Sequence, residues 1–143
     1  MKSLVAAIGV LVGSASILAG CAEFTNSDVG KEEYQANCAA CHGSSGKGDG
    51  PQAEMLATKP ADLSMLAKKN GGEFPDSRVY EMIDGRLMVA AHGSREMPVW
   101  GDEFQLEETR SPRDDSTQGF SEREARVNAR IKALVDYLKG LQQ

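Results

Sequence analysis

The five residues Cys38-Ala39-Ala40-Cys41-His42 constrain this chain more than any other feature. Two thiols three positions apart lie on one face of a helical turn, so both can reach one edge of a flat ligand. The imidazole of His42 follows directly and can reach the centre of that ligand. This pattern is typical of haem attachment through two thioether bonds. We therefore predict one covalent haem c, with His42 as an iron ligand whose other ring nitrogen donates to a carbonyl.

Two other uses of a Cys-x-x-Cys pair fit this chain less well. A zinc site needs a second pair of ligands, and the remaining candidates are His92 and Cys21. A thioredoxin-like redox motif needs a βαβ context, and no strand-like alternation of apolar residues is obvious in the sequence. The histidine directly after the second thiol favours haem.

The N-terminal segment has the pattern of an export signal. Met1-Lys2 is positive, and residues 3–19 follow without a charge. An uncharged run of this length is at the short end for a span of the membrane. We expect a signal peptide over residues 1–20 and a polar tether over residues 21–27.

The end of that segment, Leu18-Ala19-Gly20-Cys21, resembles the lipobox of bacterial lipoproteins. The resemblance implies cleavage before Cys21 and a diacylglyceryl group on its thiol. Stable anchoring takes two or more acyl chains, because one chain binds a membrane only marginally. The expected location is the cell envelope, with the protein lipid-anchored and facing the periplasm of a bacterium.

The candidate for the sixth iron ligand is Met97. It lies in Arg95-Glu96-Met97-Pro98-Val99-Trp100-Gly101, where proline and glycine predict an irregular loop rather than a helix face. A thioether ligand raises the reduction potential of the iron. His92, another methionine, or an open iron site are the alternatives.

With these residues in hand, the chain resembles a class I cytochrome c from about Gly30 to Leu141. The resemblance implies an all-α domain over residues 28–143, with three to five helices around one haem. It places His42 and Met97 on opposite faces of the iron. It also implies that the Pro60 carbonyl accepts from the haem histidine, with Pro51 as the alternative.

Helices are expected where capping residues precede an apolar repeat. The clearest follows Ser121-Glu122-Arg123-Glu124, which has the pattern of a capping box. Gly30, inside the first helix, fits a close crossing of the first and last helices near Tyr137. Val79, Met82 and Ile83 share one helix face and should pack near the haem. The expected ranges are 28–40, capped by Ser27 or Asp28, then 64–69, 77–84 and 122–139.

Residues 102–119 carry an excess of acidic side chains and lack periodicity. We interpret this insert as a solvated loop; the alternative is a docking surface for a basic partner. The formal net charge of the whole chain is −5, which argues against nucleic-acid binding.

The sequence is consistent with three functions. The first is an electron carrier rather than an enzyme, with redox proteins as donor and acceptor and no small-molecule substrate at the iron. Arg86 and Trp100 are then candidate partners of the haem propionates. The second is a haem c subunit of a larger membrane oxidoreductase. The third is a peroxidase or gas sensor, which requires an open iron site and a distal group such as His92.

Overall fold

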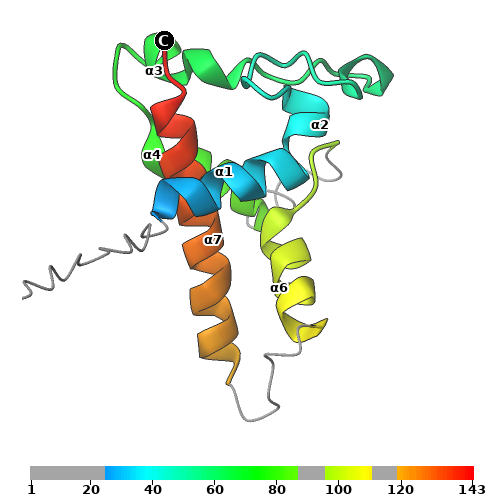
Figure 1. Cartoon of the computed structure of the whole chain (residues 1–143), viewed down its shortest axis with the longest axis vertical. Coiled ribbons are helices and arrows are strands. Elements are labelled where there is room, and N and C mark those ends of the chain that lie inside the picture. The colour runs from blue at the N-terminus through cyan, green and yellow to red at the C-terminus, as the bar shows by residue number, and fades with distance from the viewer. Residues whose placement is uncertain (1–24, 87–95, 111–118) are drawn as a thin grey trace, which may run out of the picture.

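The computed structural model of the protein describes residues 25–86, 96–110 and 119–143. Within these ranges the secondary structure is helical and no strand occurs, which confirms the predicted all-α fold. In Figure 1, α1 lies across α7, while α6 runs beside the lower part of α7. In chain order, the helices are α1 (Asn26–Asn37), α2 (Ala39–His42), α3 (Leu66–Lys69), α4 (Asp76–Asp84), α6 (Trp100–Arg110) and α7 (Phe120–Gly140), with short 3-10 turns at Ala53–Met55 and Leu63–Met65.

The first helix begins slightly earlier than the sequence suggested. Thr25 is the N-cap of α1, and its hydroxyl accepts from the Asp28 amide while the Asp28 carboxylate accepts from the Thr25 amide. This reciprocal pair is a capping box, with Asp28 in the position that glutamate more often fills. Residues 25–27, expected as part of the tether, are therefore the cap and first turn of α1.

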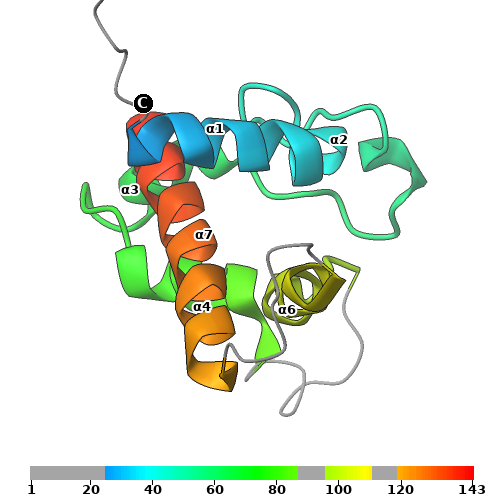
Figure 2. The same cartoon turned by 60° about the horizontal axis from the view of Figure 1, so that its bottom comes forward.

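The crossing of α1 and α7 depends on Gly30, as predicted. A Cβ atom at this position would overlap the carbonyl oxygen of Ala133 and come within 2.9 Å of the Tyr137 Cβ. One turn later Tyr34 is fully buried, and its ring centroid lies 5.2 Å from that of Tyr137. Figure 2, turned by 60°, shows the same crossing of the two helices. Glycine lets the two backbones approach closely enough for these rings to pack.

The hydrophobic core lies between α7 and the helices around it. Its residues recur on α7 at helical spacing, which is the apolar repeat seen in the sequence. The helix starts at Phe120 with Gly119 as its N-cap, and no side chain caps it. The predicted capping box at Ser121 is therefore wrong, because Ser121 lies inside the first turn. The buried core members are Tyr34, Phe74, Val79, Ile83, Phe104, Val127, Ile131, Leu134, Val135 and Leu138.

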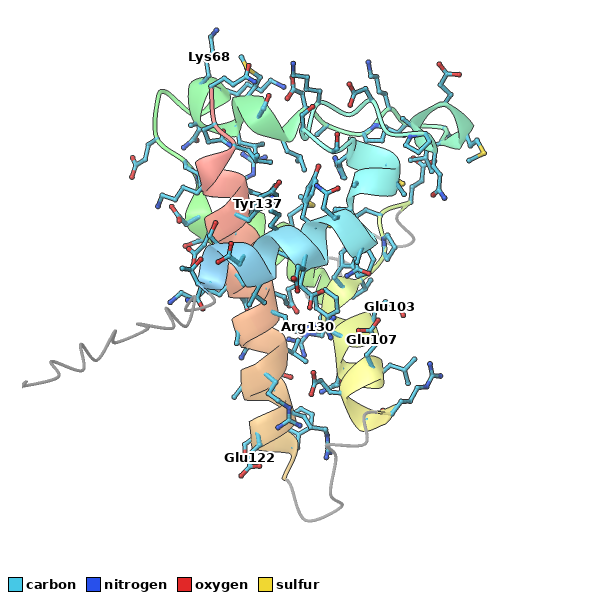
Figure 3. All side chains as sticks on the ribbon, in the orientation of Figure 1. Lys68, Glu103, Glu107, Glu122, Arg130 and Tyr137 are labelled. Carbon is cyan, nitrogen blue, oxygen red and sulfur yellow. The ribbon has the colours of Figure 1, made fainter. Side chains whose placement is uncertain are left out.

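The acidic stretch expected as a loop is helical as far as Arg110, where α6 ends. Phe104 is completely buried, and the Arg130 guanidinium of α7 lies 3.9 Å from its ring centroid. Arg130 also pairs with Glu107 at 2.9 Å, and the two side chains come from facing helices in Figure 3. Glu108 pairs with Arg126 of α7 at 2.6 Å. These contacts explain the helix, and they show that two of the expected docking carboxylates are engaged within the protein.

The helices of the described part of the chain differ from membrane-spanning helices. None of them combines the length and the apolar character that crossing a membrane would require.

Candidate functional site

The thiols and the histidine of the Cys-x-x-Cys-His motif lie on a single helical turn. Cys38 ends α1 and caps α2, and its carbonyl accepts from the amides of Cys41 at 3.2 Å and His42 at 2.9 Å. The backbone turn therefore brings both thiols and the imidazole to the wall of the same cavity. The spacing of the two cysteines and the histidine therefore places all three side chains at one cavity, as predicted.

That cavity has a volume of about 670 Å³ and lies between α2, the segment around residues 56–66, α4 and the segment 96–100. Its size is within the roughly 300–1,000 Å³ that cofactor pockets occupy. Most of the lining is apolar, and two thiols and an imidazole open into it, so the residues present fit a haem. The lining residues are Asn37, Cys38, Cys41, His42, Leu56, Thr58, Lys59, Pro60, Ala61, Leu63, Leu66, Lys69, Asn70, Pro75, Arg78, Val79, Met82, Ile83, Glu96, Met97, Pro98 and Trp100.

The imidazole of His42 is oriented by a backbone carbonyl. Its Nδ1 lies 3.1 Å from the carbonyl oxygen of Ala61. A carbonyl can only accept, so Nδ1 carries the proton and Nε2 is left as the metal-binding nitrogen. The sequence pointed to the Pro60 carbonyl, with Pro51 as the alternative, and this detail is wrong by one residue. The Pro60 carbonyl faces Gly48 instead, where a Cβ atom would overlap it.

Met97 lines the same cavity, although it is far from His42 in the sequence. Its half-buried side chain packs against the hydrophobic core and lines the cavity together with Trp100. Glu96, directly before it, accepts from the amides of Ala57 at 2.7 Å and Thr58 at 3.0 Å. The structure thus brings Met97 and Trp100 to the cavity that contains His42. His92 and Cys21, which were also named from the sequence, lie outside the described residues.

The environment of the Cys38 thiol argues against a redox-active dithiol. Burial, with smaller contributions from Glu33 and Cys41, raises the pKa of the Cys38 thiol to about 12. Reactive cysteines in Cys-x-x-Cys redox motifs have a lowered pKa, since the thiolate is the nucleophile. A zinc site finds no support either: the described ranges contain no group of three or more histidine, cysteine, aspartate or glutamate side chains placed to hold a metal ion.

Arg86, expected near the haem propionates, lies elsewhere. Its guanidinium pairs with Asp84 at 2.7 Å and with both carboxylate oxygens of Glu124 on α7, at 2.7 and 2.9 Å. It does not line the cavity. The hydrogen bonds to Glu124 raise the pKa of Arg86 further, so the group is a permanent cation held between two carboxylates. The role predicted for Arg86 is therefore wrong, because these contacts turn it toward α7.

This ion pair predicts a pH dependence of stability. The Arg86 guanidinium holds the pKa of the Glu124 carboxyl below its usual value of 4.5. Because the folded-state pKa is lowered, the stabilisation is present above about pH 4.5 and is lost as the pH falls through the lowered pKa. We expect the stability difference between the native protein and Glu124→Gln to shrink between about pH 5 and pH 3. Urea midpoints across this range measure it.

The control for this experiment is Glu122→Gln, which removes an exposed carboxylate on the same helix (Figure 3). Its stability difference from the native protein should be small at every pH. A Glu124→Gln difference that stays constant down to pH 3 would contradict the assignment.

The cavity lining also contains three cationic side chains that were not predicted from the sequence. They are Lys59, Lys69 and Arg78. In the described part of the chain none of them pairs with a carboxylate. Unpaired cations around an apolar cavity favour a ligand that is apolar and carries negative groups. One signal was available: Arg78 is four residues before Met82, so it shares the helix side that was expected to face the haem.

The comparison with protein families agrees with this geometry. The model of the family described as cytochrome C oxidase, cbb3-type, subunit III matches residues 25–111, which is more than half of the chain. The matched range includes both thiols, His42 and Met97. Neither the comparison with curated proteins nor the comparison with solved structures gives a match. The thiol pair, the histidine, the all-helical fold and the family match together place the chain in the cytochrome c family of cbb3-type cytochrome c oxidase subunit III.

Proposed function

We propose that this protein is a monohaem electron carrier whose iron is ligated by His42 and Met97. The family supports haem-based electron transfer. The finer assignment depends on one observation: an imidazole oriented through its Nδ1 and a half-buried thioether line the same cavity as the two thiols. A histidine and a methionine together fill both axial positions of a haem iron. Such a site has no open position for a small-molecule substrate.

A bound haem would supply a one-electron couple at its iron. Each residue of the site has a separate task around that group. Cys38 and Cys41 fix one edge of the ligand, and the bond from His42 to Ala61 sets the plane of the imidazole and increases its basicity. The thioether of Met97 favours the reduced metal.

The remaining lining residues adjust the same equilibrium. Val79 and Ile83 are buried and exclude water from the cavity wall, which disfavours the more highly charged oxidised state. Lys59, Lys69 and Arg78 are placed to bind the carboxylates of the ligand. The potential of this carrier would thus be set by its axial ligands and by the surrounding apolar side chains.

The proposed location of the carrier rests on the N-terminal segment. We propose that the thiol of Cys21 carries the lipid anchor and that the domain faces the periplasm. The support is the charged start, the uncharged run and the Leu18-Ala19-Gly20-Cys21 sequence. Such an anchor would restrict the carrier to redox partners within reach of one membrane surface.

Spectra of the purified protein with its haem, together with a redox titration, test the ligand assignment. We expect a near-infrared sulfur-to-iron band in the oxidised protein and a single one-electron transition. The reduced protein should bind carbon monoxide slowly or not at all, because Met97 occupies the position. Absence of the band together with rapid binding of carbon monoxide would instead support the peroxidase or gas-sensor alternative.

A second candidate is a fixed subunit of a larger respiratory oxidoreductase. The description of the matching family, which names a subunit of an oxidase, favours it. Extraction with mild detergent distinguishes the two forms of the proposal. Stable copurification with other redox subunits would identify a subunit, whereas release as a single polypeptide would identify a mobile carrier.

A further inference from the structure

One short segment forms hydrogen bonds both to His42 and to Glu96, the residue directly before Met97. We call residues 57–61 the strap. At its start, the amides of Ala57 and Thr58 donate to the carboxylate of Glu96, which directly precedes Met97. At its end, the carbonyl of Ala61 accepts from Nδ1 of His42. The two ligand-bearing segments, far apart in the sequence, are therefore tied to the same five residues.

We propose that Glu96 is a positioning residue that holds Met97 at the iron by fastening its segment to the strap. The inference rests on the proposed His42 and Met97 ligation and extends it. Glu96 does not itself contact the metal in this proposal; it acts through the residue that follows it. The proposal assigns a function to an exposed carboxylate that would otherwise be interpreted as part of the solvated surface.

The strap is well suited to transmit such a constraint. Pro60 fixes one backbone torsion and restricts Lys59 before it. The carbonyl oxygens of Pro60 and Ala61 pack against Gly48, where a Cβ atom would come within 3.3 Å of the second of them. Two residues beyond the strap, the amide of Leu63 donates to the carbonyl of Gly46 at 2.6 Å. These contacts restrain the strap, so the Glu96 contact and the His42 contact act on the same restrained segment.

The contact of Glu96 is also stronger than an ordinary surface interaction. One carboxylate accepts from two backbone amides, at 2.7 and 3.0 Å, across 39 and 38 residues of sequence. Hydrogen bonds to an ionised acceptor are shorter and stronger than those between neutral groups. Two of them on one side chain fix both its position and its direction. The backbone of Met97 is attached directly to this fixed point.

The test compares Glu96→Ala and Glu96→Gln with the native protein, each with its haem attached. Removing both hydrogen bonds should raise the fraction of protein with Met97 detached by roughly tenfold, given the usual strength of bonds to a charged group. We therefore expect the rate of carbon monoxide binding to the reduced protein to rise roughly tenfold in Glu96→Ala. The sulfur-to-iron band should also be lost at a lower temperature. Glu96→Gln keeps one acceptor and should lie between the two.

Glu54→Gln is the matched control. Glu54 is exposed, lies three residues before the strap, and has no side-chain hydrogen bond or ion pair within the described ranges. It should leave the band and the carbon monoxide rate unchanged, while circular dichroism checks that every variant folds. If Glu96→Ala fails to retain haem, Glu96→Gln carries the test alone.

The outcomes separate this inference from the proposed function. If the native protein shows the band and both Glu96 variants keep its intensity, thermal loss and carbon monoxide rate, the positioning role is wrong while the ligation stands. If the native protein lacks the band, the Met97 assignment fails and this inference fails with it. A graded effect, largest in Glu96→Ala, supports the proposal.

Discussion

Replacing Met97 with alanine is expected to abolish the sulfur-to-iron band and to lower the reduction potential by on the order of 0.1 V or more, since axial ligands shift haem potentials over several tenths of a volt. A thioether ligand would stabilise the reduced iron, and alanine offers no donor atom in its place. The cavity wall also loses a half-buried side chain that packs against the hydrophobic core. The reduced variant should bind carbon monoxide rapidly. A redox titration and a carbon monoxide mixing experiment measure these effects.

Two further variants identify the cause of that change. Met55 is 74% exposed and does not line the cavity, so Met55→Ala should leave the spectrum and the potential as they are. Met97→His should restore two strong axial ligands but keep the potential low, because imidazole favours the oxidised iron more than a thioether does. A Met97→Ala protein with an unchanged band and potential would show that another residue ligates the iron.

Replacing Gly30 with alanine is expected to destabilise the protein by about 3 kcal/mol, a typical upper value for overpacking. Alanine normally stabilises a helix by about 1 kcal/mol relative to glycine, so the sign of the effect is diagnostic. The added methyl group would overlap the Ala133 carbonyl oxygen and crowd the Tyr137 Cβ. The first of these is backbone of α7 and cannot rotate away. Urea unfolding of the protein with its haem attached measures the loss.

The matched control is Gly140→Ala at the last position of α7. A Cβ atom there would meet nothing within 4 Å. This substitution should be neutral or slightly stabilising, as helix propensity alone predicts. If Gly30→Ala behaved in the same way, the close contact between α1 and α7 would not be present in solution.

Local spacing was the part of the site that the sequence predicted best. One helical turn is enough to bring Cys38 and Cys41 to the same cavity. Their spacing in the sequence therefore predicts their relative positions. The close approach at Gly30 was also predicted, because a glycine within a helix calls for a neighbouring backbone. The all-helical fold was implied by the resemblance to class I cytochromes c, and the apolar repeat on α7 predicted its last helix.

Three of the errors share one physical cause, which is contact between segments distant in the sequence. Arg86 was expected at the haem, but it pairs with Glu124, which is 38 residues away. The residues around Arg86 in the sequence give no sign of this partner. Residues 102–110 lack a clear apolar repeat, and their helix is stabilised by Arg130 and by burial of Phe104. The acceptor for His42 is Ala61 rather than Pro60, whose carbonyl packs against Gly48, a residue distant in the sequence. None of these partners can be found from neighbouring residues.

The crossing of α1 and α7 also has a consequence for the order of folding. Glu33 on α1 and Arg130 on α7 are paired across 97 residues of sequence, so α1 reaches its native partner only after nearly the whole domain is available. This pairing forms only when a loop of that length closes, and such closure carries an entropic cost. The Cys38 and Cys41 thiols directly follow α1 and therefore stay accessible while the chain is still open. On the proposal that these thiols attach a haem, we expect attachment to take place in that open chain, before the cavity closes around the ligand.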